Sequence, residues 1–303
     1  MVTTTNPAGA IYDRGYRPYD GPRGGRRAAT VALYRASIRR ALGLRRSWRQ
    51  KVPPFVLLAI VTVPAIVNVG IGYVTRDQVG RTFEFITYRD YVGVSSALLV
   101  FVALTAPDIV CPDRRQRVLP LLFARPLTGV DYVIAKVGAV FSVLFLFSYL
   151  PQVVLFVGQA FVSDSALDYT RDNLDVLWQV PVSVLFLAAF YAVVGIAVSS
   201  LFSRRIVAGA SLIGLFLVTS ITSSILVGEP LEDQATGSAW AVLDLLTLPL
   251  QLRDLVFLGH IDSDAQSPLK GVEYGGQYAV LAYLAVIAVG CIVLLRRYRW
   301  TER

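Results

Sequence analysis

Few residues in this chain have the chemistry to catalyse a reaction or bind a metal ion. The single histidine, His260, is followed by Asp262 and Asp264, a pattern more typical of a solvated loop than of a metal site. Cys111 and Cys291 both fall at the predicted cytoplasmic ends of apolar runs, so neither a disulfide nor a CxxC pair is indicated. The sequence has no HExxH, GxSxG or P-loop motif and no pair of aspartates inside an apolar run. We therefore expect no catalytic, cofactor-binding or metal-binding residues.

The most informative polar stretch lies between two apolar runs, from Asp113 to Lys136, with the sequence DRRQRVLPLLFARPLTGVDYVIAK. Pro120, Pro126 and Gly129 limit helix length, which predicts one or two short helices joined by a turn. The basic residues that keep this insert out of hydrocarbon are Arg114, Arg115, Arg117 and Arg125, and the apolar patch consists of Val118, Leu121, Leu122 and Phe123. Such an insert suits contact with an acidic partner protein, but an ordinary basic loop has the same composition.

The composition indicates an all-α integral membrane protein. Of 303 residues, 55% are apolar and 17% are charged, and the apolar residues fall in runs of about 20, the length that crosses roughly 30 Å of hydrocarbon. A β-barrel would show short alternating segments instead. The six predicted transmembrane helices are Pro53 to Val74, Tyr91 to Val110, Tyr132 to Phe161, Val176 to Phe202, Ile206 to Gly228 and Gly276 to Leu295.

The distribution of charge predicts the orientation of these spans. With both termini, the Asp113 to Lys136 insert and the turn at Ser203 in the cytoplasm, 23 Lys and Arg lie inside and 6 outside. Acidic residues show the opposite bias, with 6 inside and 15 outside. This asymmetry follows the positive-inside rule, so both termini are expected to be cytoplasmic. The first 50 residues lack a signal-peptide pattern, and the first span is expected to serve as the signal.

Two segments precede the first span. Residues 1–27 are rich in Pro, Gly, Arg and Tyr without periodicity, which predicts a cytoplasmic tail. Residues 28–51 are predicted to form an amphipathic helix in the membrane interface, with arginines facing anionic lipid. Its apolar face comprises Val31, Tyr34, Ile38, Leu42 and Trp48, and its basic face comprises Arg35, Arg39, Arg40, Arg45, Arg46 and Arg49. Nucleic-acid binding by these arginines is the weaker alternative, because a membrane span follows at once.

The last outer loop, residues 229–275, is too apolar to be a free loop. Within it, Trp240 to Leu258 is interrupted by charged residues and by Pro249, so it is too broken to span the membrane. We expect an outer helical hairpin between spans 5 and 6 that bends at Pro249. Two roles fit such a hairpin equally: a lid that stabilises the bundle, and closure of an outer gate.

At the core of the membrane, the predicted spans contain uncharged polar residues rather than ionised ones. Candidates for a substrate path are Asn68 in the first span and Thr219, Ser220 and Ser223 in the fifth. Gly209, Ala210 and Gly214 begin the fifth span and favour either close helix packing or such a path. A proton- or sodium-coupled pump lacks its expected intramembrane carboxylate here, which favours an external source of energy.

These features together resemble the permease, or membrane subunit, of ABC-2 type ATP-binding cassette transporters. The resemblance covers the architecture of nearly the whole chain, but in residues it covers only the insert. The matching residues there are Arg114, Arg115, Arg117, Leu119, Leu121, Leu122, Arg125, Pro126, Leu127, Tyr132 and Lys136. Thr128 and Gly129 stand where family members often have a basic residue. The segment YDRGYRPYDGPR and the ratio of 26 Arg to 3 Lys resemble actinobacterial members.

The resemblance implies a permease subunit, acting as an exporter, in a bacterial cell membrane. Residues 52–303 would form the six-span domain, with a coupling insert at 111–132 and the outer hairpin at 229–275. It implies no enzymatic activity in this chain, since ATP and Mg²⁺ would bind to separate cytoplasmic ATPase subunits, and it implies a second permease copy, surrounding membrane lipid and no nucleic acid. The implied ATPase contacts are Arg114, Arg115, Arg117, Leu121, Leu122 and Phe123, with the coupling helix at Asp113 to Phe123. A non-transporting membrane anchor or assembly subunit is the main alternative, and a lipid-processing enzyme lacks a nucleophile–base pair.

Overall fold

The computed structural model describes residues 24–44, 48–79, 87–92, 95–124, 126–163, 165–227, 238–261, 269 and 272–299. The tail predicted over 1–27 lies outside these ranges except for residues 24–27. Helices make up the regular structure of the described ranges, in which no strand occurs. They are α1 Arg26–Ala41, α2 Trp48–Val79, α3 Tyr88–Val92, α4 Ser95–Arg115, α5 Leu119–Phe123, α6 Gly129–Val162, α7 Ala166–Asp172, α8 Leu174–Leu201, α9 Arg205–Val227, the 3₁₀ helix η1 Ala239–Leu243, α10 Leu248–Leu258 and α11 Gly275–Arg299.

Six helical segments are long and apolar enough to cross a membrane, which confirms the predicted number of spans. Their bounds are Pro54–Val74, Tyr88–Arg115, Gly129–Val162, Leu174–Leu201, Arg205–Val227 and Gly275–Arg299. The longest, α6, has 34 residues and is therefore about 51 Å long, more than the hydrocarbon thickness. It must tilt or project beyond the apolar layer.

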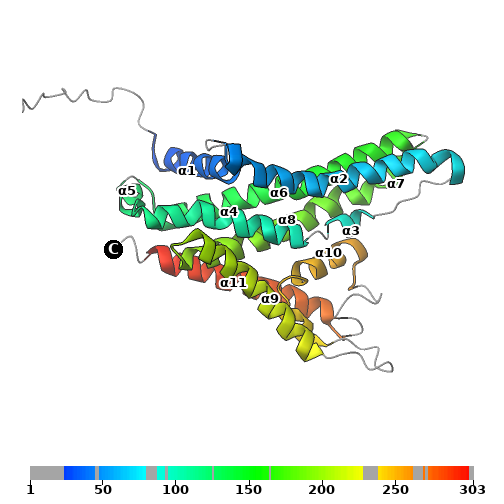
Figure 1. The fold of residues 1–303 in the computed structure, drawn as a ribbon. Coiled ribbons are helices and arrows are strands. Elements are labelled where there is room, and N and C mark those ends of the chain that lie inside the picture. The colour runs from blue at the N-terminus through cyan, green and yellow to red at the C-terminus, as the bar shows by residue number, and fades with distance from the viewer. Residues whose placement is uncertain are drawn as a thin grey trace, which may run out of the picture.

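The six helices differ in how much of their apolar surface is covered by protein. In α8, 72% of the apolar window is buried, against 17% in α2 and 17% in α9. Figure 1 shows α2 and α9 on opposite sides of the bundle, with α4 and α8 between them. Gly195 of α8 permits close packing, because a Cβ there would lie 2.4 Å from Val102 Cγ1 of α4. The span of α4 is likewise 73% buried, so the core of the bundle is built on α4 and α8.

The helix predicted over 28–51 is two helices, and the single-helix prediction was wrong. Helix α1 ends at Ala41, and Gly43 adopts a left-handed conformation with φ of 64°. The amide groups of Gly43 and Leu44 donate to the carbonyl oxygens of Arg40 and Arg39 at 3.1 and 3.0 Å. Glycine tolerates this conformation without steric cost and commonly ends helices in this way.

The segment before α11 turns earlier than predicted. Residues 244–247 form the turn between η1 and α10, and Pro249 lies in the first turn of α10. A proline is favourable there because the first amide groups of a helix have no intrahelical acceptor. The prediction of a bend at Pro249 was therefore wrong, because this proline lies at the start of α10. The remainder of the predicted hairpin, residues 229–237 and most of 262–271, lies outside the described residues.

The bundle has two distinct ends, which we name by their short helices. At the α5 end lie α5, the start of α6, the first residues of α9 and the C-terminal end of α11 (Figure 1). At the α10 end lie α3, α7 and α10 (Figure 1). Residues 203–204 form a tight bend between α8 and α9, as predicted.

Candidate functional site

The insert between α4 and α6 forms a compact cap on the α5 end. Helix α4 ends at Arg115, and a turn at 116–118 leads into α5. Arg117 has a positive φ of 52°, which reverses the chain. The start of α6 carries a capping box, in which the Thr128 hydroxyl accepts from the Asp131 amide and the Asp131 carboxylate accepts from the Thr128 amide. The prediction of a helix over Asp113 to Phe123 was wrong, because its first residues belong to α4.

A buried ionic cluster lies directly beneath this cap. Lys136 Nζ is 2.6 Å from Asp113 Oδ2, and Arg40 Nη1 donates to Asp113 Oδ1 at 2.8 Å. The Tyr132 hydroxyl donates to Asp113 Oδ2 at 3.0 Å, and Lys136 also donates to the Ile109 carbonyl at 3.0 Å. Asp113 is 5% exposed and Lys136 is 2% exposed. Because each charge meets an opposite charge and further hydrogen bonds, the burial is tolerated.

This cluster joins three helices that are distant in sequence. Asp113 comes from the end of α4, Lys136 from α6 and Arg40 from α1. The sequence predicted that Arg40 faces anionic lipid, and that prediction was wrong, because the side chain turns inward to Asp113. This contact was hard to predict, because Arg40 and Asp113 are 73 residues apart and the segment 28–51 contains six arginines.

Helix α1 is attached to α6 at two further points. Arg26 Nε donates to Asp131 Oδ2 at 2.6 Å, and Arg26 Nη2 donates to Thr128 Oγ1 at 3.1 Å. One end of this pair is open to solvent, because the Arg26 side chain is 58% exposed. Further along, the hydroxyls of Tyr34 and Ser142 are 2.7 Å apart. Helix α1 therefore lies along α6, and its location in the membrane interface stays a prediction.

The structure divides the predicted ATPase contacts into two groups. Arg115, Arg117 and Leu121 are exposed, and Leu121 is 71% exposed. The half-buried Arg114 instead donates from Nη1 to the carbonyl oxygens of Ser200 and Phe202, where α8 ends. It satisfies acceptors that a helix terminus leaves without partners. Arg114 is thus part of the connection between α4 and α8.

The other predicted contacts, Leu122 and Phe123, are half-buried. The Phe123 ring lies edge-on to Tyr132, with ring centroids 6.2 Å apart, and Tyr132 in turn lies 4.7 Å from the Tyr298 ring of α11. Helix α5 is therefore packed on the cluster through an aromatic contact. Its exposed residues are Pro120 and Leu121, and the exposed Arg115 and Arg117 precede it in the chain.

The predicted path residues do not form one site within this chain. Asn68 lies on α2, whereas the others lie on α9, on the opposite side of the bundle (Figure 1). Asn68 is 2% exposed, and Ser223 is 4% exposed and donates to the Trp240 carbonyl at 3.3 Å. Thr219 and Ser220 are half-buried. Only this last pair has partial access to the surface of the bundle.

A second ionic cluster, which the sequence did not predict, lies at the α10 end. Asp254 Oδ1 accepts from Arg89 Nε at 2.9 Å and from Arg253 Nε at 2.8 Å, and Arg253 Nη1 donates to the Arg89 carbonyl at 3.0 Å. Arg253 is 8% exposed and Asp254 is 5% exposed. In the sequence, this cluster was indicated only by Arg253 and Asp254, two adjacent residues of opposite charge inside an apolar segment. The cluster fixes α10 to α3.

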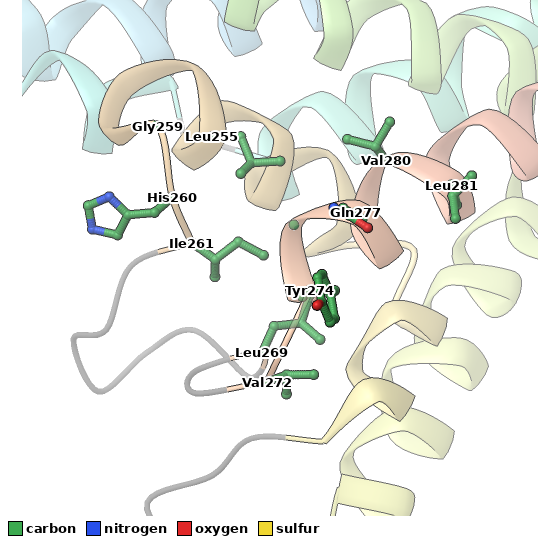
Figure 2. Close-up of a pocket in the computed structure, with 12 residues that line it drawn as sticks. Leu255, Gly259, His260, Ile261, Leu269, Val272, Tyr274, Gln277, Val280 and Leu281 are labelled. Carbon is green, nitrogen blue, oxygen red and sulfur yellow. The ribbon is translucent and has the colours of Figure 1, made fainter.

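A cavity of about 740 Å³ opens between the C-terminal end of α10 and the start of α11 (Figure 2). Figure 2 shows Tyr274 and Gln277 among mostly apolar lining residues. His260 lies on the rim, with Nδ1 2.8 Å from the Leu258 carbonyl oxygen. Within the ranges that the structure describes, no group of three His, Cys, Asp or Glu side chains could hold a metal ion. Asp262 and Asp264 lie outside those ranges.

The fold and these sites define a multi-span helical protein, by the length and composition of its helices, with an anchored cap at one end. No family model matches the chain. No curated protein matches it either.

Proposed function

We propose that this chain is the membrane permease subunit of an ATP-driven transporter of the ABC-2 type, acting as an exporter in a bacterial cell membrane. The observation that carries this proposal is the geometry of α5. Leu121 of this short helix is exposed, as are Arg115 and Arg117 in the segment that leads into it, while Phe123 on its inner side packs on the buried ionic cluster through Tyr132. A helix in this position can be displaced by a separate protein that binds to it, and it can transmit that displacement to the transmembrane helices.

The route of transmission follows from the contacts around α5. Leu119 is 8% exposed, and the Phe123 ring contacts Tyr132, which donates to Asp113. Asp113 is fixed to α6 by Lys136 and to α1 by Arg40. Displacement of α5 therefore moves the ends of α4 and α6 together, because buried, fully paired groups resist separation. The moving unit would be α1, α4 and α6 as one body.

The remaining parts of the proposal concern partners and orientation. The charge asymmetry supports a cytoplasmic location for the α5 end and for both termini. ATP and Mg²⁺ would bind to the partner ATPase subunits, and this chain would contribute no catalytic group. A second permease copy would complete the transporter. Thr219 and Ser220 are the path candidates that retain partial exposure.

Affinity purification of the chain from its native host, with mass spectrometry of the bound proteins, tests this function. We expect an ATP-binding-cassette subunit at about one copy per chain. The variant Arg115→Glu/Arg117→Glu should lose that subunit, since like charges replace the basic surface. Arg114 is left intact because it binds the end of α8. The matched control Arg35→Glu/Arg39→Glu, which reverses two exposed arginines of α1, should retain the subunit.

Two results would count against the proposal. Recovery of the chain without any ATPase, even after crosslinking, would make the insert an ordinary basic loop and favour the membrane-anchor function. Equal loss of the ATPase in both variants would show that total charge, rather than the surface around α5, determines binding.

A further inference from the structure

A hollow of about 520 Å³ lies at the α5 end, next to Arg114. Four elements supply its walls: the end of α4, α5, the end of α8 and the last turns of α11. The described lining residues are Arg114, Leu119, Leu201, Val293, Arg296, Arg297 and Tyr298. Figure 1 shows α5 and the C-terminal end of α11 at this same end of the bundle.

The charged residues among the described lining of this hollow are all basic. Three guanidinium groups line it, and no acidic residue is among its described lining residues. Arg114 is held in place by the two carbonyl oxygens that its Nη1 contacts, and within the described part of the chain its Nε and Nη2 make no other hydrogen bond. Arg296 and Arg297 are exposed. The neighbouring carboxylate of Asp113 is already bound by Lys136 and Arg40.

The rest of the lining is apolar and belongs to the membrane-spanning helices. Leu201 is the last residue of α8 and is 51% exposed, and Val293 lies within the span of α11. The hollow therefore lies where the apolar spans meet their basic ends. Guanidinium groups bind phosphate through planar, paired hydrogen bonds, and an adjacent apolar wall suits an acyl chain.

We propose that this hollow binds an anionic phospholipid of the adjacent leaflet, with its phosphate on the three arginines and an acyl chain along Leu201 and Val293. Basic pockets between transmembrane helices are suited to anionic head groups. A lipid fits better than an acidic protein segment because the apolar wall continues into the span, which a soluble segment would not follow. The site is independent of the transporter function, since it requires only insertion into a membrane.

Native mass spectrometry of the full chain in mild detergent tests this site, with phosphatidylglycerol or phosphatidylcholine added in increasing amounts. Phosphatidylglycerol should bind about tenfold more tightly, as expected for two or more arginines near a lipid phosphate. Arg296→Gln/Arg297→Gln should reduce this preference to near parity. Arg115→Gln/Arg299→Gln removes two exposed arginines that do not line the hollow and should keep the preference.

A second variant tests the shape of the site separately from its charge. Leu201→Trp fills the hollow without changing any charge, and it should weaken phosphatidylglycerol binding while the thermal unfolding of the chain stays unchanged. Equal loss of preference in both arginine pairs would overturn the site in favour of general electrostatics. Displacement of the lipid by excess inorganic phosphate would identify a soluble phosphate site, and tighter binding of polyglutamate would identify an acidic protein segment; either result refutes the lipid site.

Discussion

Replacement of Asp113 by asparagine tests whether the buried ionic cluster holds the α5 end together. The substitution keeps the shape of the side chain but removes the carboxylate that faces Lys136 and Arg40. The Arg40 side chain is 33% exposed and can turn to solvent, whereas that of Lys136 is 3% exposed and is left with uncharged partners, among them the Ile109 carbonyl and the Tyr132 ring. The cost therefore falls mainly on Lys136. Removal of one partner from a buried pair costs about 3–5 kcal/mol, and we expect a loss near 3 kcal/mol because Arg40 can relax.

The assay is unfolding of the purified chain by sodium dodecyl sulfate in mixed micelles, followed by the fluorescence of its four tryptophans. The double variant Asp113→Asn/Lys136→Met removes the unpaired charge and should recover at least about 1 kcal/mol relative to Asp113→Asn. Asp168→Asn is the control, because the Asp168–Arg171 pair is separated by 4.0 Å with side chains 70% and 76% exposed. Exposed pairs contribute only about 0–1 kcal/mol.

The reasoning is refuted if Asp113→Asn destabilises the chain no more than Asp168→Asn does. It is also refuted if the double variant is less stable than Asp113→Asn, since Lys136 would then contribute without its carboxylate partner. If Asp113→Asn lowers the free energy of unfolding, Asp168→Asn does not, and the double variant recovers part of the loss, then the buried Asp113–Lys136 ion pair is the source of the stability.

Two further substitutions test the packing of the bundle by the same unfolding assay. Gly209→Ala should destabilise the chain by about 1–3 kcal/mol, because the new Cβ would lie 2.8 Å from the Ala103 carbonyl oxygen of α4. Gly214→Ala is the control: its new Cβ meets open space, and it should not destabilise the chain. Tyr34→Phe removes the hydrogen bond to Ser142 and should cost about 1 kcal/mol, with increased proteolysis of α1; unchanged stability and protection would show that α1 is held by its ionic contacts alone.

The interruptions between helices were only partly predictable from local sequence. The bend at residues 203–204 was predicted because two adjacent arginines inside an apolar run are costly to insert. The break at Gly43 was missed, since the apolar periodicity of residues 28–51 continues across a glycine whose left-handed conformation the pattern does not encode. Pro249 was recognised as special but was placed at a bend rather than at a helix start. A proline permits either, and the turn at 244–247 decides between them.

The candidate site was predictable in position but not in detail. The insert was located because its arginines and prolines stand out between two apolar runs. The division of its residues was not predictable: Arg114 and Arg115 are adjacent and chemically identical, yet one binds the carbonyl oxygens at the end of α8 and the other is exposed. Such a difference depends on where a neighbouring helix ends.

The sequence alone determined that the chain has six candidate spans, because the length and apolarity needed to cross hydrocarbon are properties of each segment by itself. Only the tertiary structure decided which spans form the core. The windows of α2 and α9 are about as apolar as those of α4 and α8, yet 17% of each of the first two is buried inside the protein, against 73% for the span of α4 and 72% for that of α8. Lipid and protein interiors are equally apolar, so hydropathy does not distinguish a lipid-facing helix from a central one. The pairing of Arg40, Asp113 and Lys136 likewise exists only after three separate helices have packed together.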